Sequence, residues 1–201
     1  YGEWDNTINL YQCDEVPVGD YDLIVIGTPP DSHMSLARAA VKDGAKAVLV
    51  EKPLCTPDLQ GAQDLYDEAL NAGCLVFIGY DHAVAKSTRR MTDMLRYMAV
   101  GKLQTLDVEF REYWGGIFMA HPWLEGPADT YLGYWKKGGG ACGEHSHAIN
   151  LWQSFAHEAG IGRIVEVSST MEFVKDGVVD YDSICLIQVR TENGTIGRVV
   201  Q

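Results

Sequence analysis

Residues 22–53 read DLIVIGTPPDSHMSLARAAVKDGAKAVLVEKP, in which two short apolar runs flank a helical pattern. The runs at 22–27 and 47–51 have the length and composition of buried strands, and Asp31 or Ser32 can cap the helix between them. Two strands that a helix joins in this way form a right-handed crossover, in which the strands are parallel. This stretch therefore predicts an α/β fold built on a parallel sheet.

The same unit repeats once downstream. Thr56 and Pro57 open a second helical pattern that ends at Gly73, and a third strand-like run, CLVFIG, occupies residues 74–79. The apolar face of this helix is expected to consist of Leu59, Ala62, Tyr66, Ala69 and Leu70. Residues 1–82 are thus expected to form one domain with three aligned parallel strands.

The pattern changes after residue 83. The segments that follow are a helix with Met91, Met94, Leu95 and Met98 on one side, a long strand near 103–113, an aromatic, glycine-rich loop through 143, a helix at 144–158, and strands at 163–173, 182–190 and 195–201. Helices followed by hairpin-connected strands are typical of an α+β unit. Residues 83–201 are therefore expected to form a second domain with a mainly antiparallel open sheet, which favours assembly into a homo-oligomer.

The composition excludes several classes of protein. The chain has 46% hydrophobic and 22% charged residues, as ordinary globular proteins do. Its net charge of -12 repels phosphate backbones and anionic membranes, so neither nucleic acid nor a membrane is expected as a partner. No run of about 18 apolar residues is present and the first residues do not resemble a signal peptide, so a cytoplasmic location is expected. The scattered cysteines are expected to be reduced: Cys13, Cys55, Cys74, Cys142 and Cys185.

The ends of the three predicted strands mark a candidate ligand site. Ligands of open parallel sheets bind beyond the carboxyl ends of the strands, which here read Gly27–Pro30, Glu51–Pro53 and Gly79–His82. Pro53 favours an extended backbone at Lys52, so the lysine side chain is expected at the edge of the sheet. From there it can reach the hydroxyl group of a bound ligand.

These stretches are similar to a known family. VIGTPPDSH at 25–33, VLVEKPL at 48–54 and FIGY at 77–80 resemble the nucleotide-binding domain of the glucose-fructose oxidoreductase and inositol dehydrogenase family (Gfo/Idh/MocA). The GGGA segment at 138–141, with the histidine that follows it, resembles the active-site segment of that family. The EKP tripeptide is the most specific element of the resemblance.

The resemblance implies a partial Rossmann-like domain that binds NAD or NADP, followed by an α/β domain that carries a small sugar or polyol substrate. It places Lys52 between the nicotinamide ribose and the substrate hydroxyl, and it makes His147 a catalytic acid or base, or a residue that orients the substrate. The phosphate-binding loop, and the residue that distinguishes NAD from NADP, are expected upstream of residue 1. The residues expected at the cofactor are Thr28, Pro29, Pro30, His33, Glu51, Lys52, Pro53 and Tyr80. The residues expected at the substrate are Tyr134, Trp135, Glu144, His145 and Asn150.

The stretch GGGACGEHSHAINLW at 138–152 allows three interpretations. It matches G-x-G-x-x-G, but no strand-like run precedes it, so it is not expected to bind a dinucleotide. A helical pattern places His145 and His147 about 200° apart around the axis, so no metal site is expected. Near a helix start His147 is expected to be a neutral base. The glycines allow a close approach of backbone and substrate.

This segment also departs from the family pattern. Gly143 and Asn150 stand where relatives usually have aspartate, and His145 stands where they usually have glycine. Either Glu144 supplies the missing carboxylate, or Lys52 and the active-site histidine act without it.

Four hypotheses about function remain open at this stage. The leading one is reversible hydride transfer between a nicotinamide cofactor and a secondary hydroxyl of a sugar or polyol. The alternatives are a glycoside-cleaving relative that retains NAD, a metal-dependent hydrolase that uses Glu144, His145 and His147, and a fragment or scaffold without activity. Replacing Lys52 by alanine helps to discriminate among them, because only the two NAD-dependent hypotheses need it.

Overall fold

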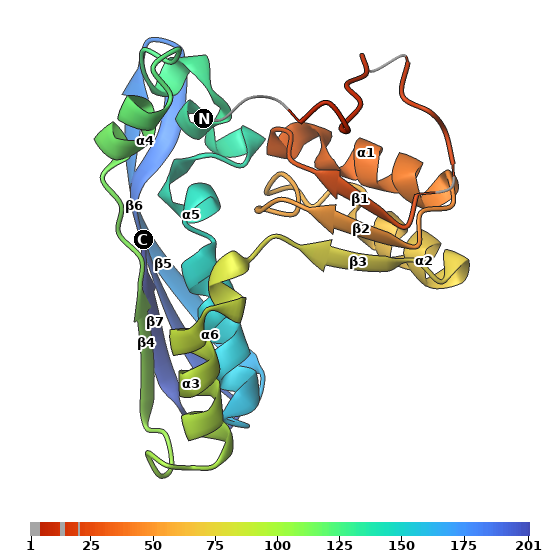
Figure 1. The fold of residues 1–201 in the computed structure, drawn as a ribbon. Coiled ribbons are helices and arrows are strands. Elements are labelled where there is room, and N and C mark those ends of the chain that lie inside the picture. The colour runs from red at the N-terminus through yellow and green to blue at the C-terminus, as the bar shows by residue number, and fades with distance from the viewer. Residues whose placement is uncertain (1–4, 13–14, 20) are drawn as a thin grey trace.

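Two β-sheets organise the protein, whose computed structural model describes residues 5–12, 15–19 and 21–201. The first sheet lies in the N-terminal part of the chain and the second in the C-terminal part (Figure 1). The predicted fold class, a parallel sheet followed by a mainly antiparallel open sheet, is confirmed. A domain boundary near residue 83 stays a prediction.

The first sheet is entirely parallel. Its elements are β1 (Leu23–Ile26), α1 (Pro30–Lys42), β2 (Ala47–Val50), α2 (Ala62–Ala72) and β3 (Leu75–Ile78). The strand order is β1-β2-β3, and the register pairs Ile26 with Val50 and Val50 with Ile78. The carboxyl ends of the three strands therefore lie level with one another, so the segments that follow them share one edge of the sheet.

The helix α1 begins differently from the prediction. Neither Asp31 nor Ser32 is its capping residue: the cap position is Pro29, in an extended backbone, and Pro30 is the first helical residue. Proline is favoured there because its fixed φ suits a helix start and its missing N–H is not needed. The Ser32 hydroxyl instead donates to the carbonyl oxygen of Pro29 at 2.8 Å.

The helix α2 begins later than the prediction, at Ala62. Leu59 and Gly61 both have positive φ, 56° and 82°, which the right-handed helix does not allow. Its predicted apolar face is wrong in part, because Leu59, Tyr66 and Leu70 are exposed. The residues of α2 that the structure buries are Leu65 and Ala69, which join the core with Val48 and Val50 of β2.

The second sheet is mixed. Its strands are β4 (Thr105–Glu109), β5 (Ile164–Asp176), β6 (Val179–Thr191) and β7 (Ile196–Val200), in the order β4-β7-β6-β5. Only the β4–β7 pair is parallel, and the other two pairs are antiparallel. The helices α3 (Lys86–Arg96) and α6 (His147–Glu158) contact each other and contribute to the core of this part. Strand β4 is shorter than the strand that was predicted near 103–113.

The predicted loop between β4 and α6 contains short helices. They are α4 (Trp114–Ala120), η2 (Pro127–Asp129), η3 (Tyr131–Gly133), η4 (Trp135–Lys137) and α5 (Gly140–Glu144), and a further turn, η1 (Asp81–Val84), follows β3. The predicted helix at 144–158 is split, because His145 and Ser146 separate α5 from α6. None of the helices in the described part of the chain combines the length and hydropathy that crossing a bilayer requires. Cys55, Cys74, Cys142 and Cys185 are free thiols, as predicted, and Cys13 lies outside the described residues.

We expect Trp152→Phe to lower the free energy of unfolding by about 1–3 kcal/mol. Trp152 is 2% exposed, and its Nε1 donates to the carbonyl oxygen of Leu106 at 2.8 Å, so the variant loses a hydrogen bond and leaves a small void. Urea unfolding measures the change. Trp123→Phe is the control, because Trp123 is exposed and its replacement is expected to change stability by less than about 0.5 kcal/mol. Equal effects of the two variants would contradict the placement of Trp152 in the core.

Candidate functional site

A cavity of 730 Å³ lies beyond the carboxyl ends of β1 and β2. Its lining residues from the first part of the chain are Gly27, Thr28, Pro29, Pro30, Asp31, Glu51 and Lys52. The opposite wall consists of His121, Trp123, Leu124, Ala128, Asp129, Thr130, Tyr131, Tyr134 and Lys137. The cavity is therefore formed between the first sheet and the helical segments that follow β4, at the position where parallel sheets bind ligands.

Lys52 is the cation at the base of this cavity. Its side chain is only 14% exposed, and its Nζ lies 2.8 Å from Oε1 of Glu144, which is 15% exposed. The same Nζ donates to the backbone carbonyl oxygen of Glu144 at 2.9 Å. Two acceptors on one residue thus hold the ammonium group at the end of β2, and the two opposite charges compensate each other in a poorly hydrated place.

Tyr131 completes the surroundings of Glu144. Its hydroxyl donates to Oε2 of Glu144 at 2.5 Å, so each carboxylate oxygen has one partner. Burial, together with the nearby Glu144 carboxylate, raises the pKa of Tyr131 far above its ordinary value, so the phenol stays protonated. Lys52, Glu144 and Tyr131 therefore form a continuous polar chain from the strand end to the helical wall.

His147 is the first residue of α6 and is 7% exposed. Burial, followed by the positive charge of Lys52, lowers the pKa of His147 to about 4. The imidazole is thus neutral near pH 7, although burial rather than the helix terminus is the main cause. Its Nδ1 is buried and has no hydrogen-bond partner among the described residues.

His145 has different neighbours from His147. Its Nε2 accepts a hydrogen bond from Nε1 of Trp114 at 3.2 Å, and its Nδ1 lies 3.6 Å from the carboxylate of Glu112. The ring of Phe110 stacks on both imidazoles, with centroid distances of 5.4 Å to His145 and 5.5 Å to His147. Within the described chain, Glu144, His145 and His147 do not form a cluster with metal-ligand spacing, which removes support for the hydrolase hypothesis.

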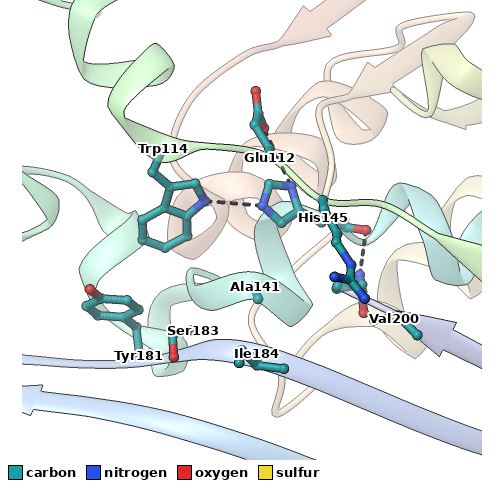
Figure 2. Close-up of a pocket in the computed structure, with 10 residues that line it drawn as sticks. Glu112, Trp114, Ala141, His145, Tyr181, Ser183, Ile184 and Val200 are labelled. Atoms are coloured by element: carbon teal, nitrogen blue, oxygen red, sulfur yellow. Dashed lines mark hydrogen bonds and ion pairs between the residues drawn. The ribbon is translucent and has the colours of Figure 1, made fainter.

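His145 faces a second cavity, of 450 Å³. Figure 2 shows the imidazole held between Trp114 and Glu112, with the ring of Tyr181 stacked on Trp114 at 5.2 Å. The other lining residues are Arg111, Ala141, Ser183, Ile184, Val200 and Gln201. This cavity lies at the end of β7, between β6 and the segment after β4, and not at the strand ends of the first sheet.

The predicted site residues divide into two groups. Those that line the larger cavity are Thr28, Pro29, Pro30, Glu51, Lys52 and Tyr134. Those outside its lining are His33, Pro53, Tyr80, Trp135, Glu144, His145, His147 and Asn150. Glu144 contacts Lys52 from behind, and Tyr80 packs edge-on against His147 with ring centroids 5.7 Å apart.

The contact of His33 with a cofactor stays a prediction, and the structure gives His33 a role within the fold. The side chain is completely buried, and its Nδ1 and Nε2 lie 2.9 Å from the carbonyl oxygen of Pro53 and 2.6 Å from that of Thr28. These carbonyl groups belong to the segments that follow β2 and β1. His33 therefore connects two strand ends and does not reach the cavity.

The glycine segment does not have the local structure that a phosphate loop requires. It follows the 3₁₀ helix η4, where a dinucleotide loop follows a strand. Gly138 has a φ of 88°, and a Cβ added there would lie 2.9 Å from Cβ of Pro30 and 3.3 Å from Cγ of Pro53. This glycine lets the segment pack closely against the ends of β1 and β2.

Three residues that sequence reasoning missed contribute to the site. Tyr131 and Phe110 belong to stretches rich in aromatic residues, which gave no way to select them. Asp182 is 2% exposed and accepts a hydrogen bond from the backbone N–H of Cys142 at 2.7 Å, and burial raises its pKa. Its position just before the apolar run of β6, close to the acidic Asp180, gave no signal that selects it.

Comparison with known proteins supports the sequence resemblance. Residues 4–80 match the model of the Gfo/Idh/MocA group, described as an oxidoreductase family with an NAD-binding Rossmann fold. The predicted resemblance is thus confirmed over this part of the chain. No curated protein sequence matches the chain.

Solved dehydrogenase structures share the fold. GenD2 from gentamicin A biosynthesis, in complex with NAD, has a TM-score of 0.72 at 21% identity, covering 89% of this chain and 47% of that one. An inositol dehydrogenase homolog from Azotobacter vinelandii, complexed with NAD⁺, has a TM-score of 0.71 at 20% identity, covering 89% and 45%. Levoglucosan dehydrogenase, in complex with NADH and levoglucosan, has a TM-score of 0.72 at 20% identity, covering 89% and 47%. The chain spans about half the length of these structures.

Proposed function

We propose that this chain, whose residues 4–80 match an NAD-binding oxidoreductase family, serves hydride transfer between a nicotinamide cofactor and a secondary hydroxyl of a sugar or polyol. The observation that carries the proposal is the partly buried Lys52–Glu144 pair at the cavity beyond β1 and β2. A lysine at the end of a parallel strand, held by a carboxylate, is suited to bind and polarise a hydroxyl group.

The described residues fit the nicotinamide side of such a cofactor. Thr28, Pro29 and Pro30 offer a small, weakly polar surface at the end of β1, and Lys52 offers the nearby positive charge. The nicotinamide ring, when bound, accepts or gives up the hydride. The residues of the chain must therefore bind the substrate, hold its hydroxyl in place and take up the hydroxyl proton.

Lys52 and His147 have separate roles in this proposal: Lys52 holds the substrate hydroxyl and His147 takes up its proton. Lys52 is proposed to contact the substrate hydroxyl, with Glu144 and Tyr131 fixing its position through their mutual hydrogen bonds. His147, which burial keeps neutral, is the proposed proton acceptor. The hydroxyl group loses its proton while the carbon that bears it loses the hydride. Together these losses give a carbonyl product and balance the oxidation.

The cavity wall suits a carbohydrate. The aromatic rings of Trp123, Tyr131 and Tyr134 lie opposite the strand ends and can cover the C–H faces of a sugar ring, while Asp129 and Lys137 offer partners for hydroxyl groups. Two of the similar structures carry related ligands: the A. vinelandii homolog was also crystallised with NADH and myo-inositol, and levoglucosan dehydrogenase with levoglucosan.

We expect the protein to bind NADH or NADPH and to reduce NAD⁺ or NADP⁺ when a cyclic polyol or neutral sugar is supplied. Fluorescence of the reduced nicotinamide measures binding, and its absorbance measures turnover over a panel of polyols, anhydrosugars and sugar nucleotides. If the protein binds the dinucleotide and cleaves a glycoside without net reduction, then the net reaction is glycoside cleavage and not hydride transfer. Failure to bind either dinucleotide would overturn the proposal.

A further inference from the structure

Three side chains with metal-ligating atoms converge beside the start of α6. Asp81 and His82 belong to η1, the short turn between β3 and α3 that contacts α6 (Figure 1), and His147 is the first residue of α6. Oδ1 of Asp81 lies 3.8 Å from Nδ1 of His147 and 3.9 Å from Nε2 of His82. All three ligand atoms lie within 4.8 Å of one another, and within the described chain no other trio of His, Cys, Asp or Glu meets this spacing.

His147 points an unpartnered nitrogen at this cluster. Its Nδ1 is buried and has no hydrogen-bond partner within the described residues. The residue as a whole is only 7% exposed. A buried nitrogen without a partner is costly, because it has lost water and gained nothing in exchange. A ligand that accepts its lone pair would remove this cost.

The surrounding aromatic rings hold the two imidazoles in place. The His82 and His147 rings meet edge to face at 4.5 Å, and Phe110 packs against both, at 5.1 Å and 5.5 Å. The Thr88 hydroxyl donates to the backbone carbonyl oxygen of His82 at 2.6 Å and fixes the turn. His147 therefore offers its nitrogen from a well-packed position, as preorganised ligands do, and the half-exposed His82 ring packs against it.

We propose that Asp81, His82 and His147 form a binding site for a divalent transition metal, with Zn²⁺ as its occupant. Two imidazole nitrogens and one carboxylate oxygen are a ligand set of catalytic zinc sites, in which a fourth position stays open to water. Zinc bonds of about 2.0–2.2 Å require ligand atoms about 3.3 Å apart. The two distances to Asp81 exceed this by about half an ångström. The exposed side chains of Asp81 and His82 can rotate to close the site around the buried His147.

The site shares His147 with the proposed acid–base chemistry but does not depend on it. Zinc on Nδ1 of His147 takes the lone pair that a proton would need there, so bound metal is expected to inhibit hydride transfer and a chelator to restore it. Metal binding itself is measured without cofactor or substrate. Failure of the metal site and failure of the proposed function are therefore distinguishable.

The test is titration of the chain with Zn²⁺ by calorimetry, and with Co²⁺ by visible absorption, which reports tetrahedral coordination. We expect one site per chain, with an affinity at least tenfold weaker in Asp81→Asn and in His82→Gln. Asp81 is exposed and His82 is half-exposed, so these variants are expected to fold, and circular dichroism checks this. The matched control is His157→Gln, an exposed histidine at the other end of α6, which is expected to bind Zn²⁺ unchanged.

Two results would overturn the proposal. The first is the absence of one-site binding of either metal to the unmodified chain. The second is an equal loss of affinity in His157→Gln and in the Asp81 and His82 variants, which would indicate unspecific binding by surface histidines. A loss of Zn²⁺ affinity in His147→Gln as well would identify His147 as the third ligand.

Discussion

Lys52→Ala is expected to lower kcat/KM for polyol oxidation by about a thousandfold, within the range of 10²–10⁴ that positioned proton-transfer groups contribute. The variant removes the only group at the end of β2 that both lines the larger cavity and bears a positive charge. It also leaves the Glu144 carboxylate, 15% exposed, beside the cavity without its cation. A negative charge there opposes the loss of a proton from substrate, which adds to the effect.

The control for this variant is Lys46→Ala. Lys46 forms an ion pair with Asp22 at 2.5 Å, but its side chain is 78% exposed and lies at the opposite end of β2. Its loss is expected to leave kcat/KM within about twofold, since exposed ion pairs contribute little. Thermal unfolding of both variants separates lost catalysis from lost folding. Lys52→Ala with near-normal turnover would remove Lys52 from the mechanism.

Gly140→Ala is expected to destabilise the protein by about 3–5 kcal/mol, a large share of the stability of an ordinary domain. Gly140 has a φ of 78°, and a Cβ built there would lie 1.8 Å from Oδ1 of Asp182. Asp182 cannot move freely, because it is 2% exposed and its Oδ2 accepts the N–H of Cys142. The clash therefore displaces α5, which carries Glu144.

Gly160→Ala separates backbone strain from this clash. Gly160 also has a positive φ, 60°, but a Cβ added there would meet no atom within 4 Å. Alanine at that position is expected to cost about 1 kcal/mol, the ordinary penalty of a left-handed residue with a side chain. Urea unfolding compares the two variants. A similar loss in both would show that Asp182 yields and that the segment is less tightly packed than its contacts indicate.

The parts of the fold that local chemistry determines were predictable. The strands β1, β2 and β3 are apolar runs of a few residues bounded by turns, and their predicted positions are confirmed within one or two residues. Because parallel strands end at one edge, the location of Lys52 followed from sequence as well. The antiparallel pairing of β6 and β7 agrees with the hairpin-connected strands that were predicted, and the turn between them contains Asn193 and Gly194, of which Gly194 has a φ of 82°.

The site itself was less predictable, because it depends on contacts between distant segments. The hydrogen bond from Tyr131 to Glu144 depends on how η3 packs against α5, and Phe110 meets His145 and His147 only through the course of β4. The burial of His33 was missed for the same reason. Its partners, Thr28 and Pro53, are backbone groups, which leave no mark in the pattern of side chains.

The pairing of Lys52 with Glu144 has a consequence for chimeric proteins. The two residues are 92 positions apart, one at the end of β2 and the other in the helical wall beside β6. Recombining the first sheet of this chain with the C-terminal half of a relative would leave the lysine without its carboxylate, unless the relative has an acid at the same place. The two halves of the chain therefore depend on each other, and a functional chimera must take both residues of this ion pair from the same parent protein.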